Sequence, residues 1–122
     1  MTDNRKQLGG WGEGVAAHHL EAKGYEILER NWRTGQGEID LVAKAGQVVV
    51  FVEVKTRRGK KVGLPEEGLT RRKADKLMLL ARQYLAQHDL DVDWRIDLVA
   101  VELDGRGKLL RCEHIQNAVL GW

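Results

Sequence analysis

The sequence predicts an α/β protein in which helices flank a mixed β-sheet, with elements in the order α-β-β-β-α-β-β. Two observations carry this prediction. Two segments have apolar residues at helical spacing, and the segments between and after them have the alternating or continuous apolar residues of strands. A chain of 122 residues is long enough to build one core, so residues 1–122 are expected to form a single domain.

The first helix is expected over about residues 10–23, and Gly24 is a typical C-terminal cap. One stripe at helical spacing faces the core, and it includes a carboxylate: Glu13, Ala16, Ala17 and Leu20. Residues 25–32 follow, with the alternation of a strand.

A β-hairpin is predicted around Gly46. Its second arm begins with the longest unbroken apolar run of the chain, residues 48–52, whose β-branched side chains favour a strand buried on both faces. The two central turn residues are either Ala45-Gly46 or Gly46-Gln47, and both are plausible hairpin turns. A three-residue loop is a third alternative.

Four charged residues lie on the two arms of this hairpin: Glu38, Asp40, Glu53 and Lys55. Side chains alternate along a strand, so either two-residue turn places all four on one face. The first turn sets Glu38 opposite Glu53, the second sets Asp40 opposite Glu53, and a three-residue loop would break the arrangement. Charges at the end of such a strand need partners, either a divalent cation with a phosphate or a plain salt bridge.

The second half of the chain begins with a basic, glycine-containing loop over residues 56–65. Thr70 is a suitable N-cap for a second helix. Strands are expected over residues 95–103 and, at an edge of the sheet, over residues 108–115. The apolar stripe of the second helix is Ala74, Leu77, Met78, Ala81, Tyr84 and Leu85.

An Asp followed by Glu-x-Lys across a hairpin resembles the PD-(D/E)XK nuclease superfamily. Further motifs resemble the YraN-type family, a group of small bacterial proteins similar to archaeal Holliday-junction resolvases, and they follow in order over nearly the whole chain. They are Gly9-x-x-Gly12-Glu13-x-x-Ala16, Gly24-Tyr25-x-Ile27-Leu28-x-Arg30-Asn31, Gly37-Glu38-Ile39-Asp40-Leu41, Phe51-Val52-Glu53-Val54-Lys55-Thr56-Arg57, Lys73, Ala81-x-x-Tyr84-Leu85, Arg95-x-Asp97 and His114-Ile115-x-Asn117-Ala118.

The resemblance implies a restriction-endonuclease-like fold and a catalytic site that uses Mg²⁺ or Mn²⁺. Asp40 and Glu53 would hold the metal, Glu13 would approach as a third acidic ligand, and Lys55 would polarise the attacking water or stabilise charge on phosphorus. Each residue also has a structural interpretation. Asp40 could close a turn or pair with Lys55, Lys55 could only neutralise the acids, and Glu13 could only favour the helix dipole. Glu38 is either an acid that supports the metal site or an arginine partner.

The net charge is only +2, but residues 55–82 carry ten Lys or Arg against three acidic residues, a local balance of +7. A basic segment that starts at the Glu-x-Lys motif is where a nucleic acid would be expected to bind. The alternative is a solvated helix face and a mobile loop. The candidate nucleic-acid-binding residues are Arg57, Arg58, Lys60, Lys61, Arg71 and Arg72.

Several other chemistries are excluded. The chain has no serine for a Ser-His-Asp triad, its four histidines have no H-x-x-x-H spacing, and the single Cys112 offers no CxxC zinc site. Arg95 and Asp97 are expected to form a structural ion pair.

The polar N-terminus and the absence of a membrane-length apolar run predict a cytoplasmic protein that does not enter membranes.

The sequence therefore predicts a nuclease-like protein that hydrolyses phosphodiesters in branched or structured DNA. The alternatives are a module on the same fold that binds nucleic acid without cutting it, or an adaptor for a DNA-processing protein. Resemblance to resolvases, which cut symmetrically related strands, makes a homodimer plausible.

Overall fold

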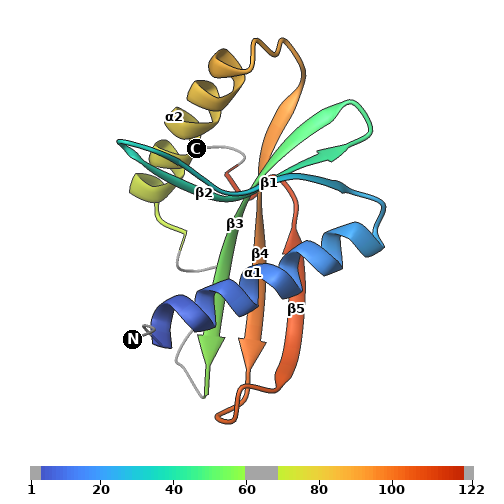
Figure 1. Cartoon of the computed structure of the whole chain (residues 1–122), viewed down its shortest axis with the longest axis vertical. Helices are drawn as coiled ribbons and strands as arrows, with labels where there is room; N and C mark the ends of the chain where they lie inside the picture. The colour runs from blue at the N-terminus through green and yellow to red at the C-terminus, as the bar shows by residue number, and fades with distance from the viewer. Residues whose placement is uncertain (1–3, 60–68, 120–122) are drawn as a thin grey trace.

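The computed structural model describes residues 4–59 and 69–119. In these residues two helices flank one five-stranded sheet, and the predicted fold class and element order are confirmed (Figure 1). The strands lie in sequence order across the sheet; β3 and β4 are parallel and the other neighbours antiparallel. The elements are α1 (Asn4–Ala22), β1 (Glu26–Thr34), β2 (Gly37–Ala45), β3 (Val48–Arg58), α2 (Arg71–Gln87), β4 (Trp94–Leu103) and β5 (Leu109–Ile115).

The two helices cover opposite faces of the sheet. On β3, Val50 and Val52 belong to the apolar cluster beneath α1, whereas Phe51 belongs to the cluster beneath α2. All three side chains are buried, as expected of a central strand covered on both faces. Neither helix in the described part of the chain is long and apolar enough to cross a bilayer.

The helix boundaries differ in one place from those predicted. The predicted start of the first helix, near residue 10, is wrong because α1 already begins at Asn4. No proline interrupts this stretch, and Arg, Lys, Gln and Leu all have good helix propensity, so the helix extends beyond its apolar stripe. The second helix begins where it was predicted, and the Thr70 hydroxyl accepts a hydrogen bond from the Lys73 backbone N–H at 3.2 Å.

The β2–β3 hairpin adopts the second of the turns considered. Ala45 pairs with Val48, so Gly46 and Gln47 form the turn, and Gly46 has a left-handed φ of 61°. The ladder ends at the pair Leu41–Val52. Beyond that pair β3 continues along β4 alone, so the two arms of the hairpin separate where the acidic residues lie.

Candidate active site

Asp40 and Glu53 are the first residues beyond the last β2–β3 pair, which is Leu41–Val52. The register thus brings together the two carboxylates that the Gly46-Gln47 turn was predicted to oppose. Because the strands separate here, the Val54 N–H has no backbone partner on β2. It donates instead to Asp40 Oδ2 at 2.8 Å. The Asp40 carboxylate therefore takes the place of a missing ladder hydrogen bond.

The environment of Asp40 opposes ionisation. Burial raises its pKa, and the neighbouring charges of Glu53 and Glu38 raise it further, to about 7, although the hydrogen bond from Val54 favours the ionised form. Burial also raises the pKa of Glu53, with Lys55 and Lys73 opposing the shift. A positive charge close to these two carboxylates would therefore favour their ionised forms.

Glu13 joins this pair from α1. The helix passes very close to β3 at Gly12, where an added Cβ would lie 1.9 Å from the Thr56 hydroxyl oxygen. The next residue is therefore held against the hairpin, and the Glu13 side chain interacts with Asp40 and Asn31. Burial raises the pKa of Glu13, and the charge of Asp40 raises it further. Glu13 therefore lies beside Asp40, and its part as a third acidic ligand stays a prediction.

Two lysines border the acidic group. The Lys55 ammonium lies 3.8 Å from Glu53 Oε1, so it does neutralise an acid, as one structural interpretation proposed. Lys73 comes from the first turn of α2 and interacts with both residues. Burial lowers the pKa of Lys55, and the adjacent Lys73 lowers it further. Lys73 was not predicted as a site residue, although its place among the residues that resemble the YraN-type family was an available signal.

The carboxylates suit a hard divalent cation by their chemistry. Mg²⁺ commonly takes one or two protein carboxylates and fills its remaining positions with water and substrate oxygens. Asp40 and Glu53 can supply those two, with Glu13 close by. Within residues 4–59 and 69–119, no three or more His, Cys, Asp or Glu side chains are grouped so that they could hold a metal ion together. An ion bound here would therefore need water and substrate oxygens in addition to the carboxylates of Asp40 and Glu53.

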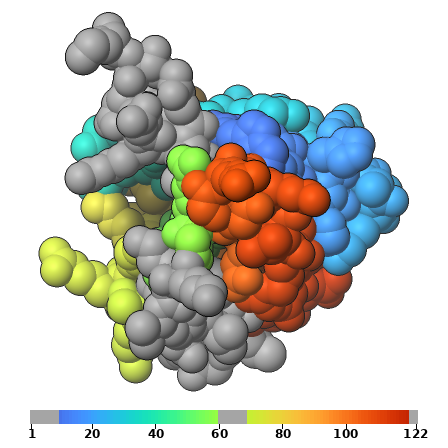
Figure 2. Space-filling view, turned by 90° about the horizontal axis from the view of Figure 1, so that it is seen from below, coloured from blue at the N-terminus to red at the C-terminus, as the bar shows by residue number. Residues whose placement is uncertain are grey.

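The structure describes four of the six candidate nucleic-acid-binding residues. The end of β3 and the start of α2 appear on the same face (Figure 2), with Arg71 and Arg72 exposed. Arg57 is half-buried, and the Arg58 guanidinium donates two hydrogen bonds to the Gly105 carbonyl oxygen, at 3.2 and 2.9 Å. Arg58 is therefore tied to the β4–β5 turn. Lys60 and Lys61 lie outside the described residues.

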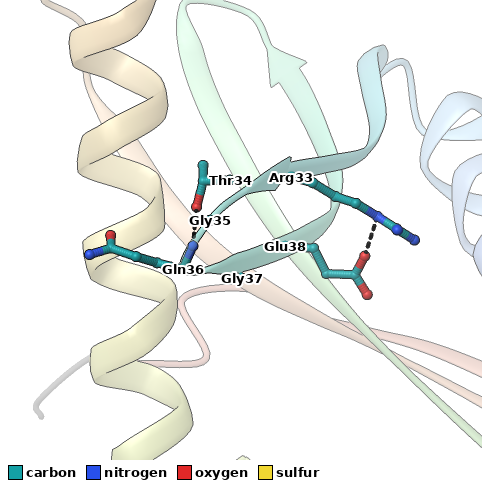
Figure 3. A pocket seen from close by; sticks show the side chains of 6 residues that line it. All are labelled: Arg33, Thr34, Gly35, Gln36, Gly37 and Glu38. Carbon is teal, nitrogen blue, oxygen red and sulfur yellow. Dashed lines mark hydrogen bonds and ion pairs between the residues drawn. The ribbon is translucent and has the colours of Figure 1, made fainter.

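Glu38 is an arginine partner. Its carboxylate lies 2.9 Å from Arg33 Nε, across the turn that joins β1 and β2 (Figure 3), and both side chains are exposed. This confirms one of the two alternatives for Glu38. Its charge nonetheless raises the pKa values of Glu13 and Asp40.

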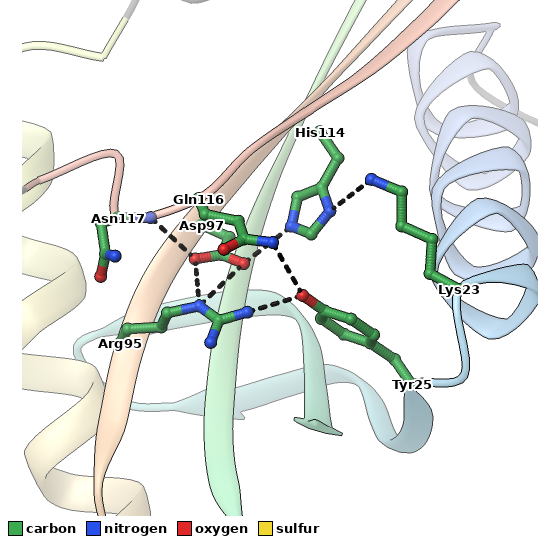
Figure 4. A network of polar contacts seen from close by, with 7 residues as sticks. All are labelled: Lys23, Tyr25, Arg95, Asp97, His114, Gln116 and Asn117. Carbon is green, nitrogen blue, oxygen red and sulfur yellow. Dashed lines mark hydrogen bonds and ion pairs between the residues drawn. The ribbon is translucent and has the colours of Figure 1, made fainter. Parts of the chain in front are cut away.

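Arg95 and Asp97 form the expected ion pair, within a larger buried network on the α1 face (Figure 4). Arg95 Nε lies 3.0 Å from Asp97 Oδ1 and its Nη2 donates to the Tyr25 hydroxyl at 2.6 Å. His114 Nε2 lies 2.7 Å from Asp97 Oδ2, and the Asn117 backbone N–H donates to Oδ1 at 3.0 Å. The network ties β4 to β5, to the start of β1 and to the segment after β5.

Asp97→Asn should destabilise the protein by roughly 1–3 kcal/mol, because it leaves buried donors without a charged acceptor. Burial alone would raise the pKa of Asp97, but hydrogen bonds from His114, Arg95 and Asn117 lower it below its ordinary value. The stabilisation is therefore present above the ordinary pKa and lost as the pH falls through the lowered one. Urea unfolding at several pH values measures this, with the exposed Asp91→Asn as control; equal stability of both variants would contradict it.

The sheet order and flanking helices define an α/β protein consistent with a restriction-endonuclease-like fold. The chain belongs to the family described as "Uncharacterised protein family UPF0102", which matches residues 12–101, and the resemblance to the YraN-type family is thereby confirmed. It is 48% identical to a UPF0102 protein of Roseiflexus castenholzii over 98% of each chain. It is 47% identical to one of Pelotomaculum thermopropionicum, over 97% of this chain and 99% of that one.

Proposed function

We propose that this protein is a Mg²⁺- or Mn²⁺-dependent nuclease that hydrolyses phosphodiesters in branched or structured DNA. The observation that carries the proposal is the pair Asp40 and Glu53 where β2 and β3 separate, with Glu13 beside Asp40 and the Lys55 ammonium beside Glu53. A fold needs no such group of half-buried acids, and their mutual repulsion disfavours it. A function that requires a bound cation accounts for it.

Each residue has a distinct part in this reaction. Asp40 and Glu53 would hold the cation, and Glu13 would hold either the cation or one of its waters. The cation would act as a Lewis acid on the scissile phosphate and lower the pKa of the attacking water. Lys55 orients that water or stabilises the negative charge that develops on the phosphoryl oxygens. Lys73, which interacts with both Glu53 and Lys55, adds a second positive charge where the phosphate would be bound.

The exposed arginines at the start of α2 would contact DNA through its phosphates. Replacing Arg71 and Arg72 together by glutamine should weaken binding to a similar degree for all sequences. It should also reduce the slope of log affinity against log salt by about 2, since each phosphate contact contributes about 1. The control replaces Arg30 and Lys44, which lie on β1 and β2. An unchanged slope in the α2 variant would place the DNA elsewhere.

Cleavage of a defined DNA panel tests the proposed function. Purified protein is incubated with a four-way junction, a flap, a fork and a linear duplex, each with Mg²⁺, Mn²⁺, Ca²⁺ or EDTA. We expect cleavage of the branched DNAs with Mg²⁺ or Mn²⁺, and none with EDTA or with the variant Asp40→Asn. Tight binding without cleavage under every metal would instead support the non-catalytic binding module.

A further inference from the structure

A cavity of about 160 Å³ lies beside the proposed reaction centre, between the β1–β2 turn and α2. One of its walls is Glu53, which we assign to the metal, and another is Lys73, which interacts with Lys55. A group bound here would therefore be a direct neighbour of the scissile phosphate. The cavity is lined by Gly37, Glu38, Glu53, Lys73, Lys76, Leu77 and Leu80.

The walls of this cavity combine apolar side chains, two lysines and two carboxylates. Leu77 and Leu80 are buried and supply an apolar surface. Lys76 is exposed, and within the described part of the chain it has no ion-pair partner. Apolar walls beside an unpaired lysine suit a flat ring joined to an anionic group, which is the chemistry of a nucleotide. Of the two carboxylates in the lining, Glu38 is paired with Arg33, and Glu53 is the one that we assign to the cation.

The width of the cavity is fixed by close packing of the turn against α2. A Cβ at Gly37 would lie 3.2 Å from Lys76 Cε and 3.3 Å from Leu80 Cδ1, and the φ of 152° also favours glycine. The Gln83 side-chain amide donates a hydrogen bond to the Gln36 side chain, which ties the tip of the turn to the helix. A space with these bounds takes one ring system, and it is too small for a base pair.

A wider and more open hollow adjoins the cavity at Gly37 and Glu38. It has a volume of about 540 Å³ and is lined by residues 33–38 of the β1–β2 turn (Figure 3). A DNA strand with one nucleotide in the cavity can therefore continue through this open hollow and over the β1–β2 turn.

We propose that the cavity between the β1–β2 turn and α2 binds one unstacked nucleobase of the substrate strand, next to the scissile phosphate. This inference rests on the proposed nuclease function. The base packs against Leu77 and Leu80, and Lys76 contacts a phosphate of the same strand. Removing a base from a continuous duplex costs unpairing and unstacking, whereas branch points, flaps and gaps present such a nucleotide already. The cavity thus selects DNA with an unpaired nucleotide at the cleavage position.

Fluorescence of 2-aminopurine tests this directly. The base analogue replaces each base in turn around the branch of a cleavable DNA, and binding is measured in Ca²⁺ so that the DNA is not cut. We expect the fluorescence to rise severalfold at one position next to the cleaved bond. Lys76→Glu should reduce that rise and slow cleavage about tenfold, whereas Arg82→Glu, on the same helix but outside the cavity lining, should change cleavage by no more than about twofold.

A second measurement needs no protein variant. An abasic nucleotide at the responding position keeps every phosphate and removes only the base, and it should slow cleavage about tenfold. Two results would contradict base binding in the cavity and leave the proposed nuclease function intact. One is DNA that is bound and cut while the 2-aminopurine fluorescence rises at no position. The other is an abasic DNA that is cut at the normal rate. Failure to bind or cut any DNA with any metal would overturn both.

Discussion

Replacing Lys55 by alanine is expected to slow single-turnover cleavage of branched DNA by ~10²-fold or more, if its ammonium stabilises charge that exists only in the transition state. Affinity for the same DNA should fall by less than about threefold, since a single phosphate contact among many is lost. The rate and the dissociation constant are measured on one branched DNA in Mn²⁺. A large loss of rate with a small loss of affinity distinguishes catalysis from binding, because a lysine that only binds DNA would change the rate and the affinity to the same extent.

The matched control is Lys44→Ala, a half-buried lysine near the turn end of β2. It removes the same charge and should leave the rate unchanged. Lys73 complicates the comparison, because it lies beside Lys55 and can partly replace its charge. The double variant Lys55→Ala, Lys73→Ala should therefore be slower than either single variant. Equal losses of rate and affinity in Lys55→Ala would favour the module that binds DNA without cutting it.

The central pair of the site could be predicted because a strand has a period of two residues. Once Gly46 marks the turn, alternation alone places Asp40 and Glu53 on one face, and the turn residues set their register. The observed pairing of Ala45 with Val48 is one of the two registers that the sequence allowed. The alternation could not show that the ladder stops at Leu41–Val52, since this depends on how the strands twist over the two cores.

The residues contributed by the helices were harder to predict, because they depend on packing between elements far apart in the chain. Glu13 reaches Asp40 only because Gly12 lets α1 approach Thr56 so closely. Lys73 reaches Glu53 because α2 covers the same face of β3. Helical spacing showed which side of each helix faces the sheet, but the spacing cannot give the position of a helix along a strand.

Asp40→Asn is expected to abolish metal-dependent cleavage, because it removes a charged oxygen ligand while keeping the shape of the side chain. Calorimetry at millimolar Mg²⁺ or Mn²⁺ should detect binding to the wild type and none to the variant. The control is Asp75→Asn, an exposed aspartate on α2. A wild type that binds neither metal would remove the main support for an enzyme.

The same substitution should make the protein without metal more stable at high pH. Asp40 holds its proton to about pH 7 when folded, against an ordinary pKa of 3.8, so the folded state binds more protons than the unfolded chain between these values. Stability of the wild type therefore falls as the pH rises through this window, and the fall is complete above pH 7. The asparagine side chain of the variant cannot ionise, so the variant should exceed the wild type at pH 8 by on the order of 1–2 kcal/mol and match it near pH 4.

Urea unfolding at both pH values, with and without Mn²⁺, measures this difference. Added Mn²⁺ should stabilise the wild type at pH 8 and leave the variant unchanged, because on this proposal only the native site with its aspartate would bind the ion. The hydrogen bond from the Val54 N–H to Asp40 gives the opposite expectation: if its strength mattered most, losing the charge would weaken the hairpin. A variant less stable than the wild type at pH 8, with no effect of Mn²⁺ on either, would mean that Asp40 serves the fold and that the metal site is absent.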